Sequence, residues 1–235
     1  MKAEAARLIR NVLDEGRTIL LEHEAKAVLE SYGIPSTKEI LCKNVEEAIQ
    51  AAELIGYPVV MKIVSPQIVH KTEFGGVKLN IRSTEDVKSS FEDMISRIKR
   101  TLGNFDFRGV LISETSRGHE LIVGSMKDPQ FGQMIMLGTG GVNVEVFKDV
   151  SYRLAPVDEI DALEMLSELK GKRLLDGYRG MEKANIDAIV SMLINVSHIL
   201  VDFSEIYEMD LNPVFANSKG VVVADARIIL SKDTS

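Results

Sequence analysis

The sequence has few of the features that mark secreted or membrane proteins. Cys42 is the single cysteine among 235 residues, so no internal disulfide can form and a reducing compartment is favoured. No apolar run approaches the ~18 residues that a membrane-spanning helix needs. Met1 is followed by charged residues and not by a signal-peptide core. We therefore expect a soluble cytoplasmic protein with no membrane partner.

The chain also lacks an excess of positive charge. It carries 28 Lys and Arg against 35 Asp and Glu, a net charge of −7. Without a basic field to collect phosphates at long range, no nucleic-acid partner is expected, although local cationic pockets remain open. There is no Pro-rich linker and no internal repeat. The hydrophobic content of 45% can build a core, and the length suits one large domain or two subdomains.

Periodicity predicts an α+β protein in two halves. Helical spacing and capping signals predict helices at residues 3–14, 22–32, 45–56, 83–102, 158–168 and 186–203. Alternating or apolar runs predict strands at residues 37–42, 59–64, 77–81, 110–114, 120–125, 133–137 and 142–147, and a final pair of strands. Residues 169–180 are expected to be irregular. A gap near Arg108 separates the halves, and a cleft between halves is a usual place for a small ligand.

The stretch from residue 59 to residue 80 holds the most chemistry. Lys62 lies inside an apolar strand, where a lysine is costly unless an anion meets it. A polar loop over residues 65–76 follows, with His70 and the pair Gly75 and Gly76, whose backbone can approach an anion closely. We interpret the stretch as a phosphate site with a histidine in a loop. The alternative is a snorkelling lysine beside a solvated histidine.

The last two strands predict a metal site. They flank a four-residue turn at residues 217–220, and pairing of Ala216 with Val221 would place Asn212 opposite Asp225. Asp210 would share that face, because strand side chains alternate. Asp and Asn oxygens suit Mg²⁺, and Arg227, opposite Asp210, could hold it or reach a phosphate. A slip of one residue would send Asp225 to the other face, and the alternative is an ion pair beside a turn.

Polar residues follow the apolar strand where the halves meet. Ser113, Glu114 and Thr115 could present backbone groups to a flat heteroaromatic ring, and Glu114 could accept a hydrogen bond from an exocyclic amine. Glu120, on the next strand, could accept hydrogen bonds from ribose hydroxyls. The alternative for each glutamate is an ordinary surface position.

The ordered set of motifs resembles an ATP-grasp fold. More narrowly, it resembles the β subunit of ADP-forming acetyl-CoA synthetases, relatives of the succinyl-CoA synthetase β subunit. The resemblance spans about residues 20–230. It rests on Gly56-Tyr-Pro-Val-Val-Met-Lys62, His70-Lys-Thr-Glu-Phe-Gly-Gly76, Asp128-Pro-Gln-Phe-Gly132, Gly138-Thr-Gly-Gly-Val-Asn-Val-Glu145, Arg153-Leu-Ala-Pro156, Asp210-Leu-Asn-Pro213 and Asp225-Ala-Arg227.

The resemblance implies an ATP-grasp fold with two α+β subdomains enclosing a nucleotide cleft. We expect an N-terminal helix over residues 1–20, one subdomain over 21–109 with a phosphohistidine loop at 65–76, and a second over 110–235. It implies a Mg²⁺ ion on Asn212 and Asp225. It also implies that ATP or ADP binds to Lys62, Gly75, Gly76, Ser113, Glu114, Thr115, Glu120, Asp210 and Arg227. It also implies a CoA-binding α subunit as partner, in an α2β2 assembly, with His70 relaying a phosphoryl group.

Two other functions remain open at this point. One is an ATP-grasp carboxylate–amine ligase that works without a histidine relay, and the other is a non-catalytic nucleotide-sensing subunit. The segment at residues 138–141 either closes over phosphates or is a plain hairpin turn. The acyl group is not readable, because the resemblance places its pocket on the partner subunit.

Overall fold

The computed structural model describes residues 2–68, 70–141 and 149–231. The chain divides into two compact units. We call residues 37–115 the small unit, and residues 1–36 together with 116–235 the large unit. Along the described chain, no helix is long and apolar enough to cross a membrane.

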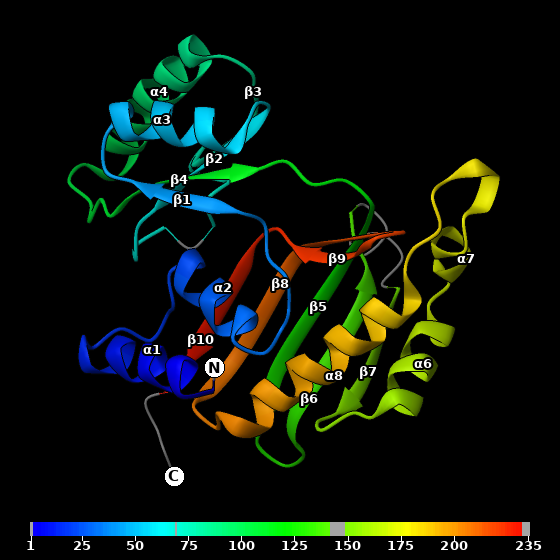
Figure 1. Ribbon diagram of the computed structural model, residues 1–235. Helices are drawn as coiled ribbons and strands as arrows, with labels where there is room; N and C mark the ends of the chain where they lie inside the picture. The colour runs from blue at the N-terminus through cyan, green and yellow to red at the C-terminus, as the bar shows by residue number, and fades with distance from the viewer. Residues whose placement is uncertain (1, 69, 142–148, 232–235) are drawn as a thin grey trace. The chain divides into compact units, whose positions relative to one another are not determined.

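The small unit is a four-stranded antiparallel sheet packed against two helices (Figure 1). The strand order is β1-β4-β2-β3. Its elements are β1 (Glu39–Cys42), α3 (Val45–Ile55), β2 (Val59–Val64), β3 (Val77–Ile81), α4 (Thr84–Leu102) and β4 (Gly109–Glu114). Both helices begin at the predicted caps, since Asn44 accepts from the N–H of Glu47 at 2.8 Å and Ser83 accepts from that of Asp86 at 3.1 Å.

The large unit is built on a six-stranded antiparallel sheet. Its order is β10-β8-β5-β6-β7, with β9 paired to β8. The strands are β5 (His119–Asp128), β6 (Gly132–Thr139), β7 (Val150–Leu154), β8 (Ile206–Asn217), β9 (Gly220–Val223) and β10 (Ala226–Leu230). The helices are α1 (Lys2–Asp14), α2 (Glu22–Glu30), α6 (Glu159–Glu168), α7 (Lys172–Leu175), the 3-10 turn η1 (Tyr178–Gly180) and α8 (Ile186–Asp202).

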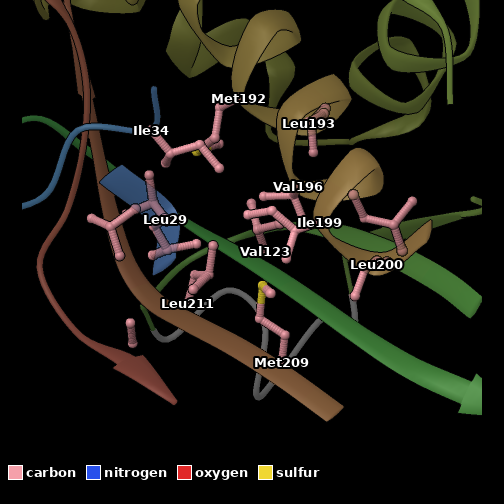
Figure 2. Close-up of a cluster of buried hydrophobic side chains, with 14 of the residues drawn as sticks. Leu29, Ile34, Val123, Met192, Leu193, Val196, Ile199, Leu200, Met209 and Leu211 are labelled. Atoms are coloured by element: carbon pink, nitrogen blue, oxygen red, sulfur yellow. The ribbon is translucent and has the colours of Figure 1, made fainter. Parts of the chain in front are cut away.

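The core of the large unit lies between α8 and one face of its sheet. The predicted inward face of α8 is confirmed, because Ile189, Leu193, Val196 and Leu200 are at most 1% exposed. Figure 2 shows Val196 and Leu200 beside residues of β5 and β8. Along β5 and β8, the side chains between these buried residues point to the sheet face that lies away from α8. Polar residues of the hairpin are therefore expected on that face.

The units divide the chain differently from the predicted boundaries. Residues 21–36 belong to the large unit, because Val28 and Leu29 of α2 are fully buried in its core and the N–H of Val223 bonds to the carbonyl of Pro35 at 2.9 Å. The strand β4 belongs to the small unit, because it pairs with both β1 and β2. The N-terminal helix α1 is also part of the large unit, with Ile9 3% exposed in the same core.

One local expectation also changes, and a second falls on residues that the structure does not describe. Residues 169–180, expected to be irregular, contain α7 and η1. The strand expected at 142–147 lies outside the described residues. Among the residues that the structure describes, β7 is the strand that follows β6, and it pairs with β6.

Candidate functional site

Lys62 occupies a central strand of the small unit. It lies on β2, where it pairs with Val77 of β3 and Leu111 of β4, and it is 7% exposed. The prediction of a buried strand lysine is therefore confirmed. Its role as an anion ligand stays a prediction, supported by the cost of burying an ammonium group.

His70 lies on a tight turn, which we call the His70 turn and define as residues 70–76. The N–H of Glu73 donates to the carbonyl of His70 at 3.2 Å, that of Gly75 to Thr72 at 3.0 Å, and that of Gly76 to Lys71 at 2.7 Å. The side chain of His70 is exposed. On the two sides of it, Ile68 is buried and Phe74 packs against the core of the small unit. Apolar anchors thus hold the ends while the imidazole stands in solvent.

Close packing around Gly75 and Gly76 leaves no room for a side chain at either position. Gly75 has φ +68°, and a Cβ there would lie 2.8 Å from Cδ of Arg97 on α4. A Cβ on Gly76 would lie 2.4 Å from Cγ2 of Ile63 and 3.0 Å from the carbonyl oxygen of Lys71. Their predicted contact with phosphate is a separate claim, which stays a prediction.

The predicted base-binding residues are hydrogen-bonded within the small unit. Ser113 Oγ donates to Glu39 Oε2 at 3.2 Å, and Thr115 Oγ1 donates to the carbonyl of Pro58 at 2.9 Å. Glu114 Oε1 accepts from the N–H of Lys38 at 3.0 Å. An exocyclic amine would have to share or replace that hydrogen bond.

Glu120 lies in the large unit, on β5. It is exposed, and its carbonyl accepts from the N–H of Gly140 at 2.7 Å. A Cβ on Gly140 would lie 2.8 Å from the Cβ of Glu120, and one on Gly141 would lie 3.2 Å from its Oε2. The segment of residues 138–141 therefore packs directly on Glu120, which places its carboxylate beside the glycines.

The register predicted for the terminal hairpin is confirmed. Ala216 pairs with Val221, and Arg227 pairs with Asp210. Between these pairs, the N–H of Asn212 donates to the carbonyl of Asp225 at 3.1 Å. Leu211 and Ala226 are a buried pair of this ladder, so the side chains next to them in sequence, Asp210, Asn212, Asp225 and Arg227, lie off the core-facing side.

Arg227 has a second carboxylate partner that the sequence reading missed. Its Nη2 lies 2.7 Å from Glu208 Oε1 and 3.4 Å from Asp210 Oδ2. Glu208 precedes Asp210 by two residues, so strand alternation alone could have placed it on the same face. The described residues hold no group of three His, Cys, Asp or Glu side chains suited to a metal. The assignment of Asn212 and Asp225 to Mg²⁺ stays a prediction.

Comparison with known proteins decides the family. A family model described as "ATP-grasp domain" matches residues 11–230. The β subunit of acetate–CoA ligase [ADP-forming] II from Pyrococcus furiosus is 48% identical over 234 residues, covering 98% of this chain and 99% of that protein. The chain belongs to the ATP-grasp family of ADP-forming acetate–CoA ligase β subunits. The predicted family and fold are confirmed.

Solved structures of related enzymes support the same assignment for this ligase subunit. Acetyl-coenzyme A synthetase 1 of Ca. Korarchaeum cryptofilum, in complex with coenzyme A, Ca-AMPCP and HgCl+, contains a chain that is 50% identical with a TM-score of 0.93. The match covers 97% of this chain and 100% of that chain. A second structure of that enzyme, with coenzyme A and Mg-AMPPCP, is described with its phosphohistidine segment pointing towards the nucleotide binding site. It is 47% identical with a TM-score of 0.83 and the same coverage.

Proposed function

We propose that this chain binds ATP or ADP and relays a phosphoryl group through His70 between its partner subunit and the nucleotide. The overall reaction is acyl-CoA + ADP + phosphate to acid + CoA + ATP. The observation that carries the proposal is the exposed His70 on a hydrogen-bonded turn, in a chain whose relative has a phosphohistidine segment.

The histidine step can be written with its bonds. A nitrogen of the neutral imidazole attacks the γ-phosphorus of ATP, an N–P bond forms, and the P–O bond to the β-phosphate breaks. ADP leaves with the bonding electrons, and the proton on the other ring nitrogen stays there. The attacking atom is the ring nitrogen that carries no proton, because its lone pair is free to form the N–P bond. The reverse step makes ATP from the phosphorylated histidine and ADP.

The protein supplies positioning and charge, which is most of what phosphoryl transfer needs. We assign Lys62 and Arg227 to phosphate oxygens, with the backbone of Gly75 and Gly76 nearby in sequence. Asp210 orients Arg227, at 3.4 Å from its Nη2. Ser113, Glu114 and Thr115 are assigned to the base, and Glu120 to the ribose hydroxyls.

The hairpin residues fit Mg²⁺. Asn212 and Asp225 offer one amide oxygen and one carboxylate from directly opposed positions, and Mg²⁺ in nucleotide sites commonly takes one or two carboxylates and fills its shell with waters and phosphates. When bound, Mg²⁺ neutralises charge on the phosphates. The same two residues would hold it here.

The partner is proposed to be a CoA-binding α subunit. The relatives that support this proposal are β subunits by name, which implies a partner α subunit. We propose an α2β2 assembly in the cytoplasm, in which a histidine of the α subunit takes the phosphoryl group first and His70 then relays it to ADP. The acid and CoA are then products of the partner, and ATP is the product of this chain.

The test is phosphorylation of His70 itself. Incubation with γ-labelled Mg·ATP followed by peptide mapping should label the wild type at His70, in an acid-labile form. His70→Asn should abolish the label, retain ADP affinity within about threefold, and lower turnover with the α subunit at least ~10³-fold. His198→Asn is the matched control, because His198 is also exposed but lies on α8. Normal turnover in His70→Asn would instead support a ligase without a relay.

A further inference from the structure

Arg97 is an exposed arginine on α4 that lies against the His70 turn. A Cβ built on Gly75 would be 2.8 Å from both Cδ and Nε of Arg97 and 3.0 Å from its Cζ. Three consecutive atoms of the side chain thus lie against one glycine. Any other residue at position 75 would displace them. The contact lies entirely within the small unit.

Gly75 is also bound into the turn that carries His70. Its N–H donates to the carbonyl of Thr72, and the next N–H, of Gly76, donates to Lys71. Because these hydrogen bonds close the turn, the position of Gly75 is coupled to that of the residues just after His70. Arg97 therefore contacts the relay segment at its C-terminal end.

The guanidinium of Arg97 still has hydrogen-bond donors to give. Among the described residues its side chain makes no hydrogen bond and no close ion pair, and its charge acts on Asp93 at longer range. Arg100 lies three residues further along α4. Its Nε donates a hydrogen bond to the carbonyl of Ser96 at 3.4 Å. Asp93, one turn earlier on α4, is paired with Lys78 of β3. An arginine with free donors, resting on a turn, is suited to an anion that arrives with that turn.

We propose that Arg97 is a positioning residue for the phosphorylated His70 turn, holding it through Gly75 and donating hydrogen bonds to the phosphoryl oxygens on His70. This inference rests on the proposed function. Phosphorylation adds nearly two negative charges and three acceptor oxygens to the turn, and a planar guanidinium binds such a group with two parallel N–H donors. Arg97 thereby stabilises the phosphorylated state relative to the free histidine.

The experiment measures an equilibrium. The full chain is incubated with Mg·ATP and Mg·ADP at several ratios, and phosphorylated His70 is quantified, which gives the constant for chain + ATP to phosphorylated chain + ADP. Arg97→Met, which keeps the apolar stem, should lower this constant about tenfold. Arg97→Lys, which keeps the charge but loses the fork, should fall between. Affinity for ADP and the melting temperature should not change.

Arg100→Met is the matched control, since it makes the same charge change on the same helix. It should leave the equilibrium constant at the wild-type value. An unchanged constant in Arg97→Met, or an equal drop in Arg100→Met, would overturn the role of Arg97. Failure of the wild-type chain to be labelled at all would instead contradict the proposed function, so the two failures are distinguishable.

Discussion

Asn212 lies directly opposite Asp225 in the antiparallel hairpin, and its N–H donates to the Asp225 carbonyl at 3.1 Å. The pairs on both sides keep the same register, with Ala216 on Val221 and Arg227 on Asp210. A slip of one residue would have turned Asp225 to the opposite face. The backbone thus places Asn212 and Asp225 at opposed positions of the hairpin.

Asp225→Asn should separate metal-dependent from metal-independent nucleotide binding. The substitution keeps the size of the side chain and removes the charge that attracts a hard cation. Mg·ADP affinity should fall at least tenfold, about 1.4 kcal/mol, while ADP affinity in EDTA should change little. Calorimetry with and without Mg²⁺ measures both.

Asp14→Asn serves as the control for that substitution. Asp14 is an exposed carboxylate at the end of α1, and the same charge change there should leave Mg·ADP affinity as in the wild type. Equal Mg·ADP affinity in Asp225→Asn and wild type would remove Asp225 from the metal site.

The isolated chain should not complete the ligase reaction. It should form phosphorylated His70 from Mg·ATP, yet make no ATP from acetyl-CoA, ADP and phosphate until the α subunit is added. The reason is that the acyl and CoA chemistry is assigned to the partner. A coupled assay for ATP, run with each subunit alone and with both, checks this. Robust ATP formation by this chain alone would contradict the division of labour.

Sequence patterns predicted local geometry better than long-range grouping. The hairpin register followed from a turn length and from strand alternation, both of which are local. Local sequence does not determine which unit α2 joins, because the apolar residues Val28 and Leu29 could pack on either sheet. The strand β4 is apolar from Val110 to Ile112, and such a run does not reveal which neighbouring strands it pairs with. Only the contacts assign both elements to their units.

In the candidate functional site, too, local sequence patterns indicate single residues but not their long-range contacts. Lys62 was recognisable as a charge in an apolar run, and His70 as a histidine in a loop with glycines. The reason for Gly76 was not recognisable, because it depends on Ile63, which lies on the preceding strand. Glu208 was overlooked although alternation placed it beside Asp210, and only its 2.7 Å contact with Arg227 gives it a role.

Gly76→Ala should destabilise the small unit. Its Cβ would lie 2.4 Å from Cγ2 of Ile63, a fully buried residue of β2, so the strand or the turn has to shift. Overpacking of this kind costs about 1–3 kcal/mol. Urea unfolding measures the loss.

A double-mutant cycle with Ile63→Ala tests the cause of that loss. Removing Cγ2 relieves the overlap, so the double variant should lose less than the sum of the two single losses. Strictly additive losses would mean that the overlap with Ile63 is not the cause.

Asp149 should make the large unit sensitive to acid. It is 5% exposed, and its carboxylate accepts from Thr139 Oγ1 at 2.9 Å and from the N–H groups of Lys170 at 2.7 Å and Gly171 at 2.9 Å. Burial alone would raise the pKa of Asp149, but the hydrogen bonds from Gly171, Lys170 and Thr139 outweigh it and hold the pKa below its ordinary value. The carboxylate joins the end of β6 to the segment before α7.

A depressed pKa in the folded state means that the ionised carboxylate stabilises the fold above the ordinary aspartate pKa, about 4, and that this stability is lost as the pH falls through the lower folded value. Asp149→Asn should therefore lower the free energy of unfolding at pH 7 by about 2–3 kcal/mol, because an amide cannot accept all three hydrogen bonds. The difference from wild type should shrink as the pH is lowered from 5 towards 3, since the carboxylate of the unfolded wild-type chain becomes protonated there while the folded one stays ionised to lower pH. Thermal unfolding of both proteins across this range measures it. A gap that stays constant down to pH 3 would show that the charge of Asp149 contributes nothing to the fold.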